Sequence, residues 1–382
     1  MNIIGIRRNV LAGFTTSLAM VPEVVAFALL AHVNPLVGLY AAVILGLVTA
    51  VFGGRPGLIS GGAGSLAVVS VALVVTHGVE YLFACIVLMG VIQLLFGAFK
   101  LGKLIKLVSP SVMTGFVNGL ALVIFLAQFH QIPFEGFALY PMLGLIIITI
   151  VGVAIAPMIT RHIPGSLFGI ILVTAVVYVF DITTKTVGDI AHISGAIPSF
   201  HLPLVPFTLE TLWIVLPYSL ILAAIGLIET LLTANLVDKT IGGKTQPNKE
   251  SMAQGAGNVL TGLFGGMGGC AMIGQTVINL EAGGHQRLAG VVQALAILAY
   301  IVFASFVIES IPIAALVGVM FVVCYHTFDW SSFKLADKPR EEVTVMLAVT
   351  VLTVFLNLAY AVLIGIVLTS MLYYWKHVRE KE

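Results

Sequence analysis

Apolar stretches of membrane-spanning length follow one another along almost the whole chain, and this feature restricts the possible folds most strongly. A helix needs roughly 20 apolar residues to cross the hydrocarbon layer. Of the 382 residues, 59% are hydrophobic and only 9% are charged, whereas about 25% of the residues in a soluble domain are charged. Water would not solvate a surface so poor in charge. The sequence therefore predicts an all-α, polytopic membrane protein whose outer surface meets the lipid bilayer.

The same composition disfavours several other classes of protein. The formal net charge of +1 gives no reason to expect nucleic acid as a partner. The three isolated cysteines make neither a disulfide framework nor a zinc site, and the histidines lack metal-ligand spacing. Gly243-Lys244-Thr245 is not a phosphate-binding loop, because Asp238 stands where that motif requires glycine. We therefore expect neither an enzyme nor a bound cofactor, and we interpret the first apolar stretch as a span rather than a signal peptide.

Charges, prolines and glycine pairs divide the chain into about fourteen apolar segments. Two of them, 63–77 and 271–281, are too short to cross a membrane alone, and each follows a glycine-rich stretch. The predicted segments are 8–31, 34–53, 63–77, 80–99, 107–130, 139–158, 164–181, 209–238, 249–267, 271–281, 287–306, 311–327, 341–357 and 358–376.

The basic residues give an independent test of this count, because Lys and Arg gather in cytoplasmic loops. If the N-terminus is cytoplasmic and the segments alternate in direction, 17 of the 18 basic residues fall on the inner side. The exception is Lys185, in the longest outer loop. We therefore expect both termini to be cytoplasmic, in the plasma membrane of a bacterial-type cell.

The two halves of the chain, 1–205 and 206–382, resemble each other. Glu23 lies within the first span and is followed by Gly61-Gly62 before the short third segment. Glu229 lies within the eighth span and is followed by Gly268-Gly269 before the short tenth segment. Seven spans per repeat is an odd number, so the second repeat is inverted. Inverted repeats with paired broken helices are typical of secondary transporters, and the breaks locate the substrate site.

Of the 17 acidic residues, only Glu23 and Glu229 fall in the middle of a span. A charged acid at a helix centre costs roughly 2.5–3.5 kcal/mol on insertion scales. Each is therefore either a neutral carboxyl bonded to a neighbouring helix, or a proton carrier or cation ligand. Thr233 lies one turn after Glu229 and would share a cation site with it, unless its hydroxyl bonds back to its own helix. Asn118 and Asn357 are further polar residues within spans.

The two short segments supply the other half of a predicted site. A helix N-terminus carries about half a positive charge and free N–H donors, so two facing half-helices would attract an anion without Lys or Arg. Side chains of the first turns would add hydroxyl and amide contacts, or would serve only as helix caps. The predicted substrate-binding residues are Glu23, Ala63, Gly64, Ser65, Ala271, Met272, Ile273, Gly274, Gln275 and Thr276.

These motifs resemble the SulP (sulfate permease) family of anion transporters. The first-span stretch 20–28 begins Met20-Val21-Pro22-Glu23, and Val37-Gly38-Leu39-Tyr40-Ala41 follows it. The stretch 228–234 around Glu229 and Thr233, then 247–250 and 254–258, resembles the family signature of the eighth and ninth spans. The stretch 265–276, followed by 282–284, resembles its tenth-span region. The resemblance covers nearly the whole chain.

The resemblance implies a fold of fourteen spans in two inverted seven-span repeats, of the kind found in uracil permeases. A core domain (8–100 and 209–306) would move like an elevator against a gate domain (107–181 and 311–376), within a single transmembrane unit. In sodium-coupled bicarbonate transporters of the family, an acid in span 8 and a hydroxyl one turn later help to bind sodium. Those positions correspond to Glu229 and Thr233 here.

Two departures from the family pattern affect the expected substrate and assembly. Many relatives carry arginine in span 10 where this chain has Gln275, so electrostatic attraction for a divalent anion is weaker. Relatives usually continue into a cytoplasmic STAS domain, whereas this sequence stops just after the last span. A homodimer is one possible assembly.

We expect a secondary active transporter of a small anion of the sulfate, bicarbonate or dicarboxylate class, with proton symport preferred. The alternatives are sodium symport of bicarbonate through Glu229 and Thr233, anion exchange, a nucleobase permease, and a channel or structural membrane protein. The coupling ion would be a proton or sodium.

Overall fold

The computed structural model describes residues 3–102, 109–133, 139–159, 163–193, 197–333, 339–356, 361 and 364–371. Within these ranges the chain forms helices and one pair of short strands. Asn357, the inner-loop residues Lys103, Lys106, Arg161, Lys334 and Lys338, and most of the predicted span 358–376 with the C-terminal basic residues lie outside the described residues.

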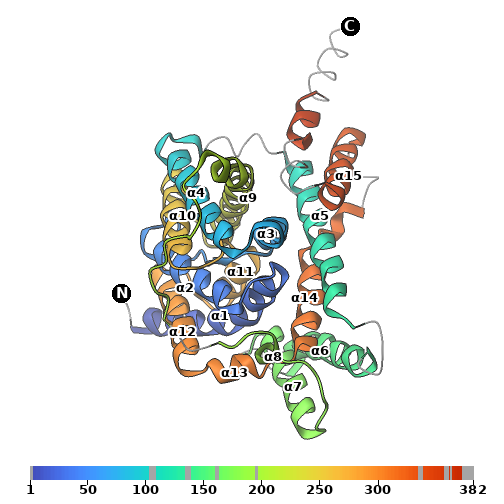
Figure 1. Ribbon diagram of the computed structural model, residues 1–382. Coiled ribbons are helices and arrows are strands. Elements are labelled where there is room, and N and C mark those ends of the chain that lie inside the picture. Colours follow the sequence, from blue (N-terminus) through green and yellow to red (C-terminus); the bar gives the residue numbers. More distant parts are fainter. Residues whose placement is uncertain are drawn as a thin grey trace.

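The helices pack in two groups, which Figure 1 shows side by side. In the first group α10 packs against α2 and α4, and α12 packs against α1 and α2. This group contains α1 (Ile3–Leu30), α2 (Pro35–Phe52), α3 (Gly64–His77), α4 (Val79–Ala98), α9 (Leu209–Ile241), α10 (Pro247–Leu263), α11 (Ile273–Glu281) and α12 (Arg287–Phe303).

In the second group α5 packs against α14 and α15, and α14 packs against α6 and α7. It contains α5 (Pro110–Gln128), α6 (Leu139–Ile159), α7 (Gly165–Val179), α14 (Ile313–Thr327) and α15 (Arg340–Phe355). The short elements are η2 (Phe129–Gln131), α8 (Val187–Ile190), α13 (Ser305–Glu309) and η3 (Trp330–Phe333). The two groups meet mainly where α1 contacts α14 and α7 and where α3 contacts α5.

Local sequence explains where several of these helices begin. Pro35 and Pro110 occupy the first turn of α2 and α5, where a missing N–H costs nothing. The residue before each proline caps the helix: Asn34 Oδ1 accepts from Leu36 N at 2.9 Å, and Ser109 Oγ accepts from Val112 N at 3.3 Å. The predicted segments beginning at 34 and 107 therefore start within three residues of α2 and α5.

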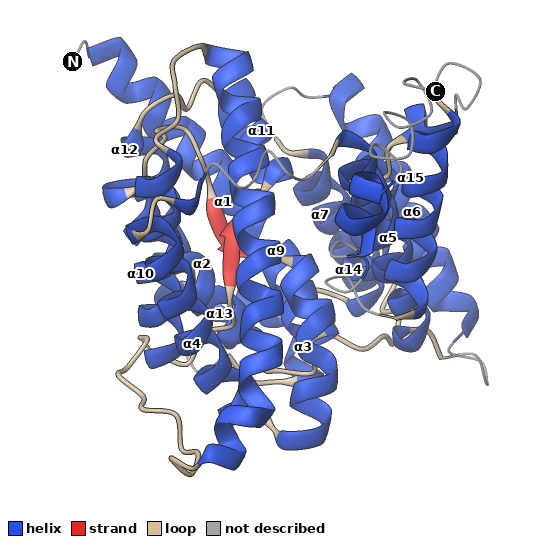
Figure 2. Ribbon diagram, turned by 90° about the horizontal axis from the view of Figure 1, so that it is seen from above, coloured by secondary structure: helices blue, strands red, loops and turns tan. Residues whose placement is uncertain are grey.

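Three glycines of the two pairs, Gly61, Gly62 and Gly269, lie in two short strands that precede the short helices. β1 (Ser60–Gly62) pairs antiparallel with β2 (Gly269–Ala271), and Gly61 lies opposite Cys270. Figure 2 shows this pair among the helices of the first group. A Cβ atom on Gly269 would lie 2.2 Å from the carbonyl oxygen of Gly61, so only glycine permits the approach. The all-α prediction therefore omits a short sheet that joins the two half-helices, α3 and α11.

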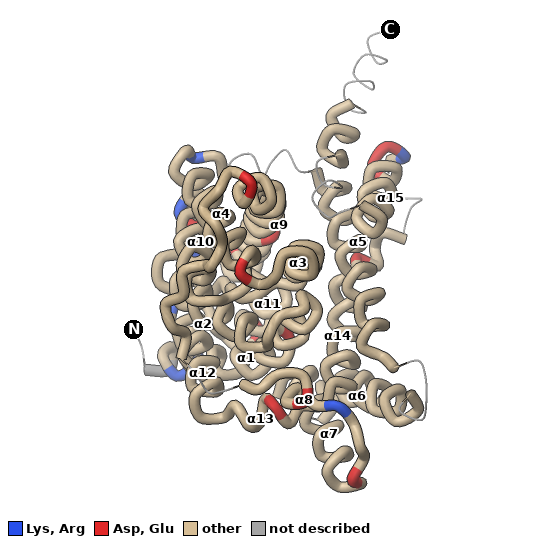
Figure 3. Tube along the Cα trace, viewed as in Figure 1, with Lys and Arg blue, Asp and Glu red and all other residues tan. Residues whose placement is uncertain are grey.

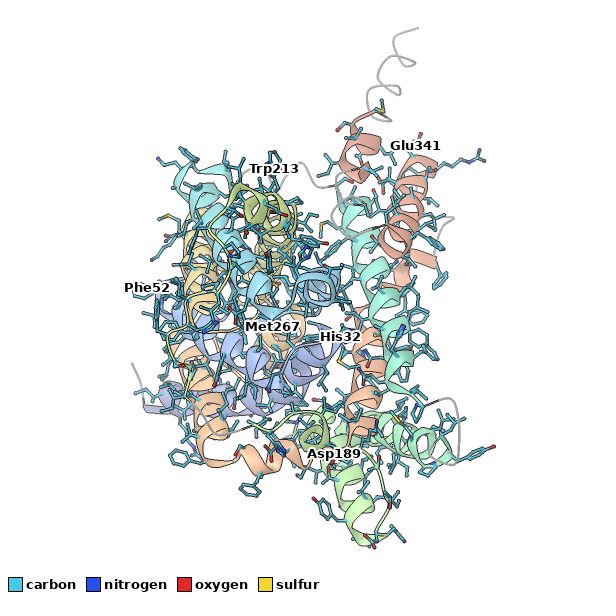
Figure 4. The ribbon with its side chains drawn as sticks, in the orientation of Figure 1. His32, Phe52, Asp189, Trp213, Met267 and Glu341 are labelled. Atoms are coloured by element: carbon cyan, nitrogen blue, oxygen red, sulfur yellow. The ribbon has the colours of Figure 1, made fainter. Side chains whose placement is uncertain are left out.

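The outer surface of the bundle is suited to lipid. Among the described residues, 6 helices are long and apolar enough to cross a membrane, and α3, α7, α12 and α14 are shorter apolar helices. Phe52 and Trp213, labelled in Figure 4, are 64% and 69% exposed, whereas Met267 is 1% exposed. Figure 3 shows Lys and Arg at helix ends and in loops. Large exposed apolar side chains and peripheral charge are what a bilayer-embedded bundle requires.

Candidate functional site

A cavity of about 710 Å³ lies between the two helix groups. The first group lines it with residues of α1, α3, α9 and α11, and the second group with residues of α5, α6, α7 and α14. The volume is ample for a small anion with water around it. Any movement of one group against the other would reshape this cavity.

The N-termini of both half-helices border the cavity. Ala63, the residue before α3, and Met272, the residue before α11, both line it. Gly64 and Ser65 follow on α3, and Ile273, Gly274 and Gln275 follow on α11. The first N–H groups of a helix have no partner within the helix, so these two first turns present donors to whatever occupies the space.

The glycines in the two first turns have different surroundings. A Cβ atom on Gly64 would lie 2.6 Å from the Phe27 ring, so this turn packs closely against α1. A Cβ atom on Gly274 would meet nothing within 4 Å. The turn at Gly274 is thus the more open of the two approaches to the main chain.

Each mid-span acid is bonded to the half-helix of the opposite repeat. Ser65 Oγ on α3 donates to Glu229 Oε2 on α9 at 2.6 Å. Gln275 Nε2 on α11 donates to Glu23 Oε2 on α1. We call this arrangement the crossed acid pairs. It places both carboxyls beside the helix N-termini, and both line the same cavity.

The electrostatics of the cavity are unusual for an anion site. Its charged or titratable side chains, among the described lining residues, are Glu23, Glu229, Glu281 and His326, with no Lys or Arg. Positive potential must therefore come from the two helix N-termini, each equivalent to about half a charge. The described residues include no three His, Cys, Asp or Glu side chains grouped to hold a metal ion. A coupling cation other than a proton would need hydroxyl or backbone oxygens near one acid.

Three of the predicted site residues do not line the cavity. Ala271 lies in β2 and is fully buried, and its N–H donates to Thr230 Oγ1 at 3.1 Å. Thr276 Oγ1 accepts at 3.1 Å from the N–H of Ile59, the residue before β1. Thr233 Oγ1 donates to Glu229 O at 2.8 Å and to Ala271 O at 3.0 Å. These polar groups hold the backbone and do not face the cavity.

The second helix group contributes lining residues that the sequence did not single out. Among the described residues they are mainly apolar, such as Leu120, Ile124 and Val319, and the one titratable side chain is His326 at the end of α14. In a wholly apolar span, the sequence does not distinguish the residues that line a cavity from those that face lipid or protein. These lining residues were therefore not predicted. Asn118 lies elsewhere, and its Oδ1 accepts from Asp329 N at 2.8 Å.

Comparisons with known proteins agree with this architecture. The model of the sulfate permease family matches residues 6–134 and 135–349. The putative sulfate transporter YbaR of Bacillus subtilis is 44% identical over 371 residues, which are 96% of this chain and 77% of the relative. The bicarbonate transporter BicA of Synechocystis is 31% identical over 366 residues, 88% of this chain and 64% of the relative.

Solved structures show the same fold. The transmembrane domain of a cyanobacterial bicarbonate transporter BicA superposes with a TM-score of 0.84 at 28% identity, covering 95% of this chain and 98% of that one. The anion transporter Slc26a9 of the mouse, in an inward-facing state, superposes with a TM-score of 0.80 at 18% identity, covering 98% and 69%. The inverted-repeat fold of these proteins is therefore the fold of this chain.

Proposed function

The chain belongs to the sulfate permease family and is an anion transporter, and from this premise we propose that it is a proton-coupled symporter whose coupling groups are Glu229 and Glu23. The anion would bind at the first turns of α3 and α11. Its class would be that of the relatives' substrates, namely sulfate or bicarbonate, or a dicarboxylate of similar charge.

The observation that carries this proposal is the crossed acid pairs. Two carboxyls border the helix N-termini, and no Lys or Arg stands among the described lining residues to offset them. An ionised carboxyl would repel an anion strongly in a site of low dielectric constant. A proton on each acid removes that repulsion, so protonation and anion binding favour each other. Such mutual favouring is the thermodynamic basis of symport.

Gln275 would link the protonation of Glu23 to anion binding. Its Nε2 donates to Glu23, while its Oε1 is buried without a hydrogen-bond partner. A protonated Glu23 would donate to Oε1, and reversal of the amide would turn Nε2 away from the acid. An amide carries a donor and an acceptor, and rotation of the group exchanges their positions, which the donor-only guanidinium of arginine does not allow. Proton uptake would thus release a donor for the anion where many relatives have a fixed arginine.

Sodium symport through Glu229 and Thr233 is the alternative coupling. Thr233 lies one turn after Glu229, and its Oγ1 is 2.8 Å from the backbone oxygen of Glu229, so the two residues share one stretch of α9. The hydroxyl is fully buried, however, and its single proton is already shared between two backbone oxygens, Glu229 O and Ala271 O. It is therefore less accessible than Ser65, whose hydroxyl contacts the carboxyl in the cavity.

The cavity's lining also suggests which side it opens to. Besides the crossed acid pairs, it reaches Pro164 and Gly165 at the start of α7, Glu281 at the end of α11 and His326 at the end of α14. The positive-inside rule assigns all of these helix ends to the cytoplasm. We therefore describe this conformation as inward-facing, and an elevator movement of the first helix group against the second would carry the site outward.

Uptake into proteoliposomes tests the function. Labelled sulfate, bicarbonate and a dicarboxylate are offered with an imposed proton gradient, an imposed sodium gradient, or a trans load of the same anion. Accumulation driven by the proton gradient alone supports the proposal. Accumulation driven only by sodium would establish the alternative, and flux only with a trans load would indicate exchange. Competition by uracil would indicate a nucleobase permease, and non-saturable flux a channel.

A further inference from the structure

Within the described residues, one edge of the strand β2 has no neighbouring strand to bond its backbone groups. In an antiparallel pair, alternate residues direct their N–H and C=O groups to opposite edges. Gly269 and Ala271 therefore share one edge of β2, and Cys270 faces the other. Because the sheet has only two strands, the edge formed by Gly269 and Ala271 has no strand beside it. Inside a membrane protein, such backbone groups require internal partners.

A side chain of α10 supplies the partners at Gly269. Asn258 Oδ1 accepts from Gly269 N at 3.0 Å, and Asn258 Nδ2 donates to Gly269 O at 3.1 Å. The amide thus makes the two bonds that a neighbouring strand residue would make. Asn258 is held in turn by Gln93, whose Oε1 accepts from Nδ2 at 2.9 Å. Both amides are fully buried.

Two hydroxyls of α9 supply the partners at Ala271. Thr230 Oγ1 accepts from Ala271 N at 3.1 Å, and Thr233 Oγ1 donates to Ala271 O at 3.0 Å. Thr230 directly follows Glu229 in sequence, so the helix with the coupling acid also holds the strand. All four edge groups of β2 are thereby bonded to side chains of two helices.

We propose that Thr230 and Asn258 are positioning residues for anion binding: with Thr233 they replace a missing third strand and so fix β2 and the first turn of α11. β2 ends at Ala271, and α11 begins at Ile273. Only Met272 separates the strand from the helix, so a shift of β2 also moves the N–H donors at Ile273 and Gly274. This inference rests on the proposed function, because it assumes that the anion binds at that turn.

The test compares Thr230→Val with Thr230→Ser in proteoliposomes. Valine keeps the shape of threonine but lacks the acceptor for Ala271 N, whereas serine retains it. We expect Thr230→Val to raise the KM for the anion about ten- to hundredfold, with a smaller change in maximal rate, in protein that folds but unfolds at a lower temperature because the buried Ala271 N loses its acceptor. Thr230→Ser should restore the KM. If Thr230→Val cannot be obtained folded, Asn258→Ser makes the same test from α10.

Thr49→Val is the matched control. Thr49 is also buried, but its hydroxyl bonds only to carbonyls of its own helix, at 2.8 and 3.3 Å. An unchanged KM in folded Thr230→Val, or an equal rise in Thr49→Val, would overturn the inference.

A second variant, Gly274→Val, distinguishes a failure of the positioning role from a failure of the proposed function. If Gly274→Val weakens binding strongly while Thr230→Val does not weaken it, only the positioning role is wrong. If neither variant changes the KM, the anion binds elsewhere.

Discussion

Gln275 on α11 donates its side-chain amide to the carboxyl of Glu23 on α1, across 252 positions of sequence. The same amide leaves its oxygen buried and without a partner. A buried, unsatisfied acceptor beside a carboxyl is a position where a proton on the acid would complete the hydrogen bonding. The pair therefore has two arrangements, and only the protonated one frees the amide hydrogens.

Glu23→Gln should separate anion binding from proton binding at this pair. The variant mimics the protonated acid, because its amide can donate to Gln275 Oε1 without titrating. In the original protein the anion affinity should fall as pH rises, since the acid loses the proton that favours binding. In Glu23→Gln the affinity should stay at its low-pH level, with any remaining pH dependence due to Glu229. Binding of labelled anion to purified protein between pH 5 and 9 measures this; an unaltered pH profile would assign Glu23 to structure.

Glu229→Gln should abolish gradient-driven accumulation, reducing it about tenfold or more, while exchange of anion for anion persists. A neutral amide still accepts from Ser65 Oγ, so the contact to α3 remains and the protein should fold. Glu210→Gln is the control, because that acid is exposed in the first turn of the same helix, α9, and does not line the cavity. Uptake under a proton gradient and counterflow are measured for both variants. Full accumulation by Glu229→Gln would remove this acid from the coupling mechanism.

Gly274→Val should weaken anion binding strongly with little effect on stability. A side chain at this position enters open space, because nothing lies within 4 Å of an added Cβ atom. It would cover the N–H groups of the first turn, and we expect affinity to fall roughly a hundredfold. Gly144→Val is the control, at a helical glycine of α6 with equal room that does not line the cavity. Ala271→Phe is a poorer probe, because Ala271 is fully buried in β2 and a large side chain there would disrupt the strand.

Gln275→Arg should shift the preference toward anions of higher charge. The substitution adds a full positive charge beside the two helix N-termini, where attraction grows with the charge of the anion. Its ion pair with Glu23 offsets part of this attraction, so a shift on the order of tenfold in the ratio of sulfate to bicarbonate affinity is expected. Competition binding gives the ratio directly. A ratio equal to that of the original protein would place Gln275 outside the anion's reach.

Cysteine labelling tests the orientation in the membrane. Cys85, Cys270 and Cys324 are free and buried, so their replacement gives a background for single exposed cysteines. A cysteine in place of Lys244 should react only from the cytoplasm, and one in place of Lys185 only from outside. Membrane-impermeant reagents on intact cells and on inverted vesicles distinguish the sides. Labelling of position 244 in intact cells would contradict the inward-facing assignment of the cavity.

Helix positions were predictable because the length of an apolar segment must match the bilayer and because proline favours the first turn of a helix. The segment predicted at 209–238 is α9 at Leu209–Ile241, and 63–77 is α3 at Gly64–His77. The strands were not predictable, since three residues have no periodicity and glycine breaks fit a helix start equally well. Their existence depends on contact between Gly61 and Gly269, which only the folded chain brings together.

The candidate site was predictable as a set of chemical groups but not as a set of contacts. An acidic residue is easy to recognise within an apolar span, and Glu23 and Glu229 both line the cavity. The partner of each acid comes from the other half of the chain, and no local pattern encodes that choice. Likewise, a threonine such as Thr230 gives no sequence sign of whether its hydroxyl bonds its own helix or a distant backbone.

The crossed acid pairs also bear on how such a protein can evolve. If the halves arose by duplication, neither half retained a self-sufficient site: the acid of the first half depends on Gln275, and the acid of the second depends on Ser65. Positions 23 and 275 should therefore vary together among related sequences, as should positions 65 and 229. A chimaera joining the first half of one transporter to the second half of another would inherit mismatched partners at both pairs, and it should recover transport only when residues are exchanged as pairs across the junction.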